Sequence, residues 1–198
     1  HWAKAGPRNL TGMDLSNRGV AYTRIRLLQD GFTPRVMRGD AERLPFPDNS
    51  FDLIYSWGVI HHSPDTPAAV SEIHRVLRPG GTARVMIYHT RSLTGYMLWV
   101  RYGLMRLRPG ISMKEIYAKY LESPGTKAYS VAEAKDLFGA YANVDIGIQL
   151  NYGDLLQSEV GRRHRGPMLK IAKALWPRPL LRLFCRNHGL YLLINARK

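Results

Sequence analysis

Short apolar runs alternate with helical stretches over the first 90 residues of this chain. Short apolar runs bounded by turn residues predict strands, and longer stretches with a 3.6-residue period predict helices. Regular alternation of the two is typical of parallel strands joined by crossover helices, so we predict an α/β fold. The predicted strands lie at 10–13, 35–37, 51–57 and 83–88, and the predicted helices at 17–29 and 67–77.

Boundary signals mark the second predicted helix and the segments after it. Thr66 can cap this helix, Pro67 suits its first turn, and the Pro-Gly-Gly run at 79–81 ends it. Residues 90–127 hold aromatic and basic residues with helical character, in a segment long enough to act as a lid. The sequence "SVAE" at 130–133 is then a capping box, which predicts a helix running to about residue 141.

Two further strands are predicted at 143–150 and 189–196. The intervening segment is too long for a tight hairpin loop, so a helical excursion must lie between them. We expect a single domain over 1–198. It comprises a cofactor-binding part at 1–90, a lid-like insertion at 91–128, and a C-terminal part at 129–198 with a basic helical insertion at about 153–188.

Composition indicates a globular chain with a strong positive charge. Hydrophobic residues make up 45% of 198, enough for a core, and a formal charge of +14 predicts attraction to phosphates, anionic lipid or acidic substrates. Cys185 is the single cysteine, and no Cys or His pair has zinc-site spacing. We therefore expect no disulfide, no metal and a reducing, cytoplasmic setting. No apolar run approaches the ~18 residues of a membrane span, and the sequence does not begin like a signal peptide.

Acidic residues follow the first two predicted strands. Asp14 closes "NLTGMD", and a strand-end acid of this kind accepts hydrogen bonds from ribose hydroxyls in nucleotide sites. Its alternative role is to cap the helix that follows. Asp40 ends the next strand and could accept from an exocyclic amine of adenine, while the Ala41 amide could donate to the ring. The alternative for Asp40 is a local cap beside an apolar plug.

Together with their neighbours, these residues resemble a known family. The segments "GMDLS", "GDAERLPFPDNSFD", "SWGVIHH" and "VLRPGG" are similar, in order and spacing, to class I S-adenosylmethionine-dependent methyltransferases of the small-molecule type, such as the ubiquinone/menaquinone C-methyltransferase group. The resemblance implies a Rossmann-like, seven-stranded sheet whose first strand is central and is followed by a glycine-rich loop. It also implies S-adenosylmethionine as cofactor and a small-molecule acceptor.

The same resemblance assigns cofactor contacts along the strand ends. It places Asp14 on the ribose hydroxyls, Leu15 against the adenine face, Asp40 and Ala41 at the adenine edge, and Ser56 and Trp57 beside the methionine part.

The beginning of the sequence departs from the family pattern. Asp14 lies too close to His1 for the central strand and the glycine-rich loop to precede it. We therefore expect an N-terminally truncated piece that lacks the first strand, and that by itself binds S-adenosylmethionine poorly and is inactive.

Candidate catalytic groups are His61 and His62, which follow the third predicted strand where an acceptor would bind. Adjacent residues on a strand point to opposite faces, so at most one histidine would face the acceptor. Such a histidine could act as a base near neutral pH. In the alternative reading both histidines pack or cap the "SPDT" turn. A dedicated base is optional, because holding the activated sulfonium beside the acceptor supplies much of the catalysis.

Absent motifs narrow the reaction class. The segment "SWGVIHH" differs from the Asn/Asp-Pro-Pro-aromatic signature of enzymes that methylate amino groups of bases or glutamine, so nucleic-acid methylation is disfavoured. No Tyr-x-x-x-Lys pair occurs, which disfavours a nicotinamide-dependent Rossmann oxidoreductase. A non-catalytic methyltransferase-like module, with a basic face for a membrane or another partner, stays open as an alternative.

The last part of the sequence is uniformly basic. Ten Lys and Arg and no Asp or Glu follow Glu159, interleaved with leucines and with Trp176 and Phe184. This pattern has three explanations: packing on the sheet edge with a solvated basic face, contact with an anionic membrane surface or amphiphilic acceptor, or RNA binding, which is the least favoured. The sequence does not specify an oligomeric state.

Overall fold

The computed structural model describes residues 2–33, 35–157 and 167–198. Six strands lie in two sheets within these residues. β1 (Gly12–Asp14) and β2 (Val36–Arg38) form a small parallel sheet. The larger sheet has the order β3-β4-β6-β5. Its strands are β3 (Phe51–Trp57), β4 (Leu77–Tyr88), β6 (Tyr191–Arg197) and β5 (Asn143–Gln149).

β6 is the one strand of the larger sheet that runs against the others. β3 and β4 are parallel, whereas β6 pairs antiparallel with both β4 and β5. The carboxyl ends of β3, β4 and β5 therefore share one edge of the sheet. Predicted strands at 51–57, 143–150 and 189–196 are confirmed, as is the α/β fold class.

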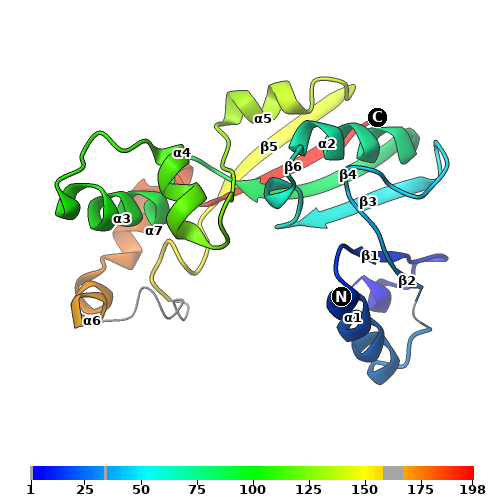
Figure 1. Ribbon diagram of the computed structural model, residues 1–198, viewed down its shortest axis with the longest axis horizontal. Helices are drawn as coiled ribbons and strands as arrows, with labels where there is room; N and C mark the ends of the chain where they lie inside the picture. The colour runs from blue at the N-terminus through cyan, green and yellow to red at the C-terminus, as the bar shows by residue number, and fades with distance from the viewer. Residues whose placement is uncertain (1, 34, 158–166) are drawn as a thin grey trace.

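One face of the larger sheet carries the main core. α2 (Thr66–Val76) and α5 (Val131–Leu137) both pack against it, above the sheet in Figure 1. Ala83, Val85 and Ile87 of β4 point into this core. The intervening Met86 and Tyr88 join a second cluster on the opposite face, as expected from the two-residue period of a strand.

The small sheet and α1 (Asn17–Gln29) form the N-terminal part of the fold (Figure 1). The predicted helix at 17–29 is confirmed, and Ser16 caps it by accepting a hydrogen bond from the Gly19 amide. β1 and β2 each begin later than predicted. β1 pairs with β2 alone and β3 pairs with β4 alone, so one edge of each is unpaired within the described residues.

The boundary between α2 and β4 differs from the prediction. Asp65, not Thr66, caps α2 by accepting from the Ala68 amide at 3.0 Å. Thr66 is instead buried, and its hydroxyl donates to the Ile60 carbonyl. The helix ends at Val76, and residues 79–81 belong to an irregular start of β4 rather than to a helix stop. The positive φ of Gly80 (+76°) accommodates this irregular stretch.

Helical segments follow β4 and fill the connection between β5 and β6. Ser130 and Glu133 form the expected capping box of α5, although that helix ends at Leu137 rather than near 141. The expected helical excursion before β6 is present, while residues 158–166 of the predicted basic insertion lie outside the described residues. The remaining helices are α3 (Leu93–Tyr102), α4 (Met113–Ile116), α6 (Pro167–Leu175) and α7 (Arg178–Phe184), with short η1 (Ala3–Ala5), η2 (Ile60–His62), η3 (Leu104–Arg106), η4 (Tyr117–Leu121) and η6 (Arg186–His188).

Helix length and hydropathy bear on the membrane question. Within the described ranges, no helix is both long enough and apolar enough to cross a membrane.

Candidate functional site

The predicted cofactor residues lie at the carboxyl ends of three strands. Asp14 is the last residue of β1, Asp40 follows β2 by two residues, and Trp57 is the last residue of β3. In open α/β sheets, ligands bind outside these strand ends. Each strand end must therefore be judged by what its side chains already contact.

Asp14 takes part in the cap of α1. Its Oδ1 accepts hydrogen bonds from the amide and the hydroxyl of Ser16, both at 2.8 Å. A Cβ at Gly19 would collide with the Asp14 carboxylate, so the helix passes close to this acid because that position is glycine. The cap of α1 is Ser16 rather than Asp14, and Asp14 Oδ1 holds this capping residue in place. The ribose role of Asp14 stays a prediction.

The loop after β2 carries the second pair of predicted residues. Asp40 is exposed, and its Oδ1 accepts from the Glu42 amide at 3.0 Å, an arrangement that orders the turn. Ala41 is partly buried against the main core. Leu15 is well exposed beyond β1, and its carbonyl accepts from Arg38. These residues present an acid and an apolar side chain near neighbouring strand ends.

Glu42 ties this loop to the turn that follows β3, a link that the sequence did not reveal. Its Oε1 accepts from the Ser63 hydroxyl at 2.6 Å and from the Asp65 amide at 2.7 Å. The loop bearing Asp40 is therefore held beside the turn that bears the histidine pair.

Arg75 of α2 fixes the rest of the same loop. Its guanidinium donates to the carbonyls of Leu44 and Phe46 at 3.0 and 2.9 Å, and to the carboxylates of Glu72 and Asp48. The Glu72 carboxylate also accepts from the Leu44 amide at 2.7 Å. Hydrogen bonds from Arg75 and the Leu44 amide, together with the nearby positive charge, lower the pKa of Glu72 although burial opposes this. The network anchors 44–48 to the helix.

Ser56 and Trp57 lie on opposite faces of β3. Ser56 is buried, and its hydroxyl has no hydrogen-bond partner in the structure. Trp57 is exposed, stacks on Tyr55 with ring centroids 5.9 Å apart, and meets Tyr191 edge to face. As neighbours on a strand, the two side chains cannot both face one ligand unless the strand end deviates. Their assignment beside the methionine part stays a prediction.

His61 and His62 lie on η2, not on a strand, so the strand argument for their orientation was wrong. They nevertheless differ in exposure. His61 is fully buried and neither ring nitrogen has a hydrogen-bond partner, whereas the His62 side chain is 29% exposed. Burial, with a smaller effect from His62, lowers the pKa of His61 to about 3. His61 is therefore neutral near pH 7, and its ring packs at a tilt against that of Tyr88, with centroids 4.2 Å apart.

A polar cluster surrounds His62 at the carboxyl ends of β3 and β4. The Tyr88 hydroxyl donates to Glu122 Oε1 at 2.8 Å, and Glu122 Oε2 lies 3.4 Å from His62 Nε2. Burial, and then the hydrogen bond and charge of Glu122, raise the pKa of Tyr88, which keeps the phenol protonated. His62 Nδ1 lies 3.2 Å from the Ser123 hydroxyl and 3.3 Å from that of Thr126. Glu122 and Tyr88 are thus site candidates that sequence reasoning missed.

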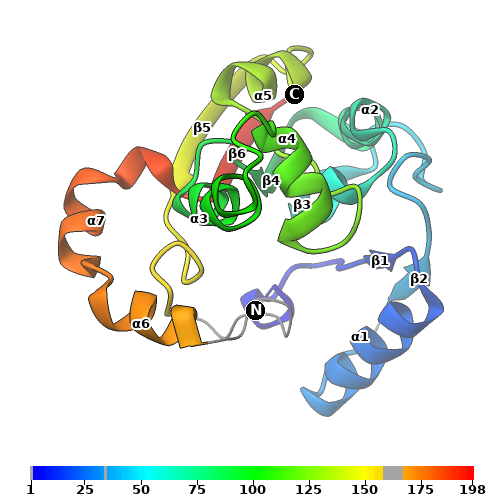
Figure 2. The ribbon, with the colours of Figure 1, turned by 60° about the vertical axis from the view of Figure 1, so that its left-hand side comes forward.

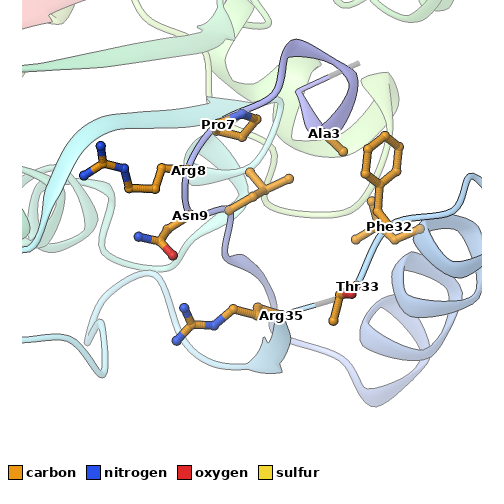
Figure 3. Close-up of a pocket in the computed structure, with 9 residues that line it drawn as sticks. Ala3, Pro7, Arg8, Asn9, Phe32, Thr33 and Arg35 are labelled. Atoms are coloured by element: carbon orange, nitrogen blue, oxygen red, sulfur yellow. The ribbon is translucent and has the colours of Figure 1, made fainter.

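Two surface hollows lie away from these residues. The one in Figure 3, of about 260 Å³, is lined by Arg8, Asn9, Phe32 and Arg35, which lie before β1 and between α1 and β2. A second is lined by Thr11, Arg24, Val36 and other residues around β2. Neither includes a predicted cofactor residue, so we do not assign either one as the site. Within the described ranges, no group of three or more His, Cys, Asp or Glu could hold a metal ion.

The N-terminal part of the sequence, which contains the predicted cofactor residues, is similar to known methyltransferases. The family described as "Methyltransferase domain" matches residues 1–85. The chain is 38% identical over 81 residues to malonyl-[acyl-carrier protein] O-methyltransferase of Pectobacterium atrosepticum, covering 41% of this chain and 30% of that protein. It is 40% identical over 73 residues to the ubiquinone/menaquinone biosynthesis C-methyltransferase UbiE of Neisseria meningitidis, covering 37% and 30%. These matches span less than a third of each relative.

Solved structures share the fold over nearly the whole chain. An S-adenosylmethionine-dependent methyltransferase from Thermotoga maritima, described as a possible histamine N-methyltransferase, has a TM-score of 0.58 at 20% identity, over 94% of this chain and 72% of that one. The [4+2]-cyclase SpnF has a TM-score of 0.60 at 17% identity, over 100% and 69%. These TM-scores establish the fold, whereas sequence identities this low leave the reaction open. Residues 1–85 match the model of the methyltransferase domain family, and the described residues share the Rossmann-like fold of solved S-adenosylmethionine-dependent methyltransferases.

Proposed function

We propose that the protein transfers the methyl group of S-adenosylmethionine to a small, amphiphilic acceptor. The observation that supports this proposal is the family match over residues 1–85. That range contains both strand-end acids, Asp14 and Asp40, and the turn that bears His61 and His62, which we call the histidine turn. S-adenosylmethionine supplies a methyl group on a sulfonium, which an acceptor can displace directly. The family match also favours methyl transfer over the nicotinamide-dependent alternative.

Residues at the strand ends have the chemistry to hold this donor. Asp14 could accept from ribose hydroxyls through the oxygen that Ser16 does not use, and Leu15 is exposed for contact with a ring. Asp40 and the Ala41 amide could take the adenine edge. Catalysis then rests on positioning, because holding two reactants in line removes much of the entropic cost of a bimolecular step.

The Tyr88–Glu122–His62 cluster is our candidate for receiving the acceptor's proton. Glu122 has a half-exposed side chain beside His62, and the protonated Tyr88 holds one of its oxygens. A carboxylate next to an imidazole can take up a proton as the methyl group arrives. His61 is enclosed and neutral, so we assign it a packing role against Tyr88 rather than that of a base.

The amphiphilic acceptor is inferred from two kinds of support. Relatives matching the N-terminal part include a probable phthiotriol/phenolphthiotriol dimycocerosates methyltransferase of Mycobacterium ulcerans, 40% identical over 76 residues, covering 38% of this chain and 29% of that protein. The described chain also exposes large apolar side chains on α7, beyond the carboxyl end of β5. The acceptor atom is not part of the proposal.

A non-catalytic module is the second candidate. It is favoured by the contacts already made at the strand ends: Ser16 occupies Asp14 Oδ1, and both ring nitrogens of His62 lie near protein groups. Such a module would use its basic face for a partner and form no S-adenosylhomocysteine.

Calorimetric titration of S-adenosylmethionine into the protein tests the donor site. Asp14→Asn should weaken binding by about 1–3 kcal/mol, because the carboxylate that accepts from two hydroxyls is lost. Ser16→Ala is the matched control, since it removes the α1 cap but leaves the carboxylate, and should change binding little. Equal affinity in Asp14→Asn and the unmodified protein would remove Asp14 from the donor site.

Turnover separates the two candidate functions. Formation of S-adenosylhomocysteine by the protein with lipid-like acceptors would support the enzyme, and donor binding without turnover on any acceptor would favour the module.

A further inference from the structure

A stretch of helices between β5 and β6 presents an apolar face to solvent. We name residues 167–188, comprising α6, α7 and η6, the C-terminal strap. Figure 2 shows α6 and α7 running along the outside of the fold. Leu180, Leu183 and Phe184 of α7 are 57%, 58% and 75% exposed, and their i, i+3, i+4 spacing puts them on one face. Leu175, at the end of α6, is 76% exposed.

Inward-facing polar contacts of the strap hold it to the rest of the protein. Trp176 Nε1 donates to the Asp154 carbonyl at 3.0 Å, and Arg178 donates to the Leu155 carbonyl at 3.1 Å. At its far end the Tyr96 hydroxyl lies 3.1 Å from His188 Nδ1. The outward apolar face is therefore presented by an anchored segment, and packing on the sheet edge does not cover it.

All the charged residues in the sequence of the strap are basic. Residues 160–198 contain ten Lys and Arg and no Asp or Glu. On the strap itself, Lys170, Arg182 and Arg186 are exposed beside the apolar residues. A face that combines exposed leucine and phenylalanine with uncompensated cations matches the interface of an anionic bilayer, where apolar groups enter the acyl boundary and cations meet the headgroups.

Other occupants fit this surface less well. Two copies of the strap would bring like charges together. RNA binding would require several exposed aromatics for base stacking, yet Phe184 is the single exposed aromatic among the described residues of the strap, and Trp176 is turned inward.

We propose that the C-terminal strap docks the protein on anionic lipid bilayers through Leu175, Leu180, Leu183 and Phe184, with Arg182 and Arg186 on the lipid headgroups. The strap leaves the carboxyl end of β5, and the histidine turn follows the carboxyl end of the parallel strand β3. Docking therefore brings the sheet edge of the proposed acceptor site toward the membrane. This last step rests on the proposed function, whereas lipid binding does not.

Flotation of the full 198-residue chain with vesicles tests the proposal. Vesicles of phosphatidylcholine that contain about 30% phosphatidylglycerol should carry the protein upward on flotation. Vesicles of pure phosphatidylcholine should carry much less of it. Arg182→Glu with Arg186→Glu should reduce the bound fraction on anionic vesicles by about tenfold or more, because each basic residue near the surface contributes to binding. Leu180→Ser with Leu183→Ser and Phe184→Ser should reduce it at unchanged charge.

The control carries the same charge reversal on other elements. Arg18→Glu with Lys135→Glu changes exposed residues of α1 and α5 and should lower binding far less than the strap pair. All substituted positions are exposed, and circular dichroism with thermal melting checks that each variant is folded. Equal losses in the strap and control pairs would reduce the effect to net charge and overturn the proposal.

Three further outcomes would also overturn it. The first is binding to vesicles that does not depend on anionic lipid. The second is release of the protein from vesicles by a single-stranded RNA that the strap residues bind more tightly. The third is a dimer that depends on Leu180, Leu183 and Phe184. Because none of these measurements uses S-adenosylmethionine, their failure is distinguishable from failure of the proposed methyl transfer.

Discussion

The buried side chain of His61 makes the stability of the fold depend on pH. Its ring is enclosed by Tyr88 and His62, and burial lowers its pKa to about 3. The unfolded chain takes up a proton on this residue below about pH 6.5, whereas the folded protein does so only near pH 3. His61 therefore makes the fold less stable as pH falls from about 6.5 toward 3.

Replacing His61 by Leu should remove this acid sensitivity. We expect the free energy of unfolding of the unmodified chain to fall, relative to His61→Leu, by up to about 1.4 kcal/mol per pH unit below pH 6.5. Urea unfolding at pH 7.5, 6.5, 5.5 and 5.0 measures the difference. Burial also lowers the pKa values of His74 and His89. Both residues are present in both proteins, so their contribution to the pH dependence cancels in the difference between the two free energies of unfolding. Parallel pH curves would contradict the prediction.

Individual residues were the hardest to foresee from the sequence. The sequence predicts Asp14 and Asp40 as site residues because each is an acid that follows a recognisable apolar run. Glu122 is 34 residues from Tyr88 and lies in a segment without strong periodicity, so no pattern in the sequence brings it to the end of β4. The contact of Glu42 with the turn after η2 likewise depends on tertiary packing.

At the scale of elements, the loop after β2 depends on one helix side chain. The guanidinium of Arg75 in α2 donates hydrogen bonds to two carbonyls and two carboxylates. Arg78, three residues later, donates to the Asp52 carboxylate and the Asn49 carbonyl. The hydrogen bonds that Arg75 donates to Glu72 and Asp48 raise its pKa further above the ordinary value, so the guanidinium stays charged.

Arg75→Met should loosen the segment that follows Asp40. We expect hydrogen exchange of the amides of Leu44, Phe46 and Asp48 to rise by at least about tenfold, because local opening no longer breaks the guanidinium contacts. Arg78→Met on the same side of the fold is the matched control and should affect these amides less. Mass spectrometry of exchanged peptides measures both, and an equal increase in the two variants would show that Arg75 is not the anchor.

Element type was predicted better than element boundary. The ranges of α1 and β3 agree with the prediction because a cap and flanking turns mark their ends. At the end of α2, a Pro-Gly-Gly run resembles a helix stop, yet the backbone has already become extended at Leu77. Thr66 and Asp65 are both capping residue types, and burial of the Thr66 side chain decided between them.

Across the whole molecule, Asp154 connects segments distant in sequence. Its buried carboxylate accepts from the amide and hydroxyl of Thr94 at 2.9 and 2.7 Å, from the Asn151 amide at 3.0 Å and from the Leu190 amide at 2.8 Å. It thereby joins the start of α3, the exit from β5 and the entry to β6.

Asp154→Asn should destabilise the fold by about 3 kcal/mol, because an amide cannot accept all four bonds and would face buried donors with its own NH₂ group. Asp145→Asn on the exposed side of β5 is the control and should have a small effect. Denaturant unfolding measures both free energies. Similar values for the two variants would mean that the Asp154 contacts contribute little.

The link made by Glu42 has a further consequence for the two halves of the proposed site. A single carboxylate joins the loop expected to face adenine and the turn expected to face the acceptor, so movement of one is transmitted to the other. If donor binding orders the first segment, it also favours the ordered form of the second, and by thermodynamic reciprocity acceptor binding must tighten donor binding by the same factor. Glu42 would then couple the affinities for the two substrates, so that each substrate binds more tightly when the other is present.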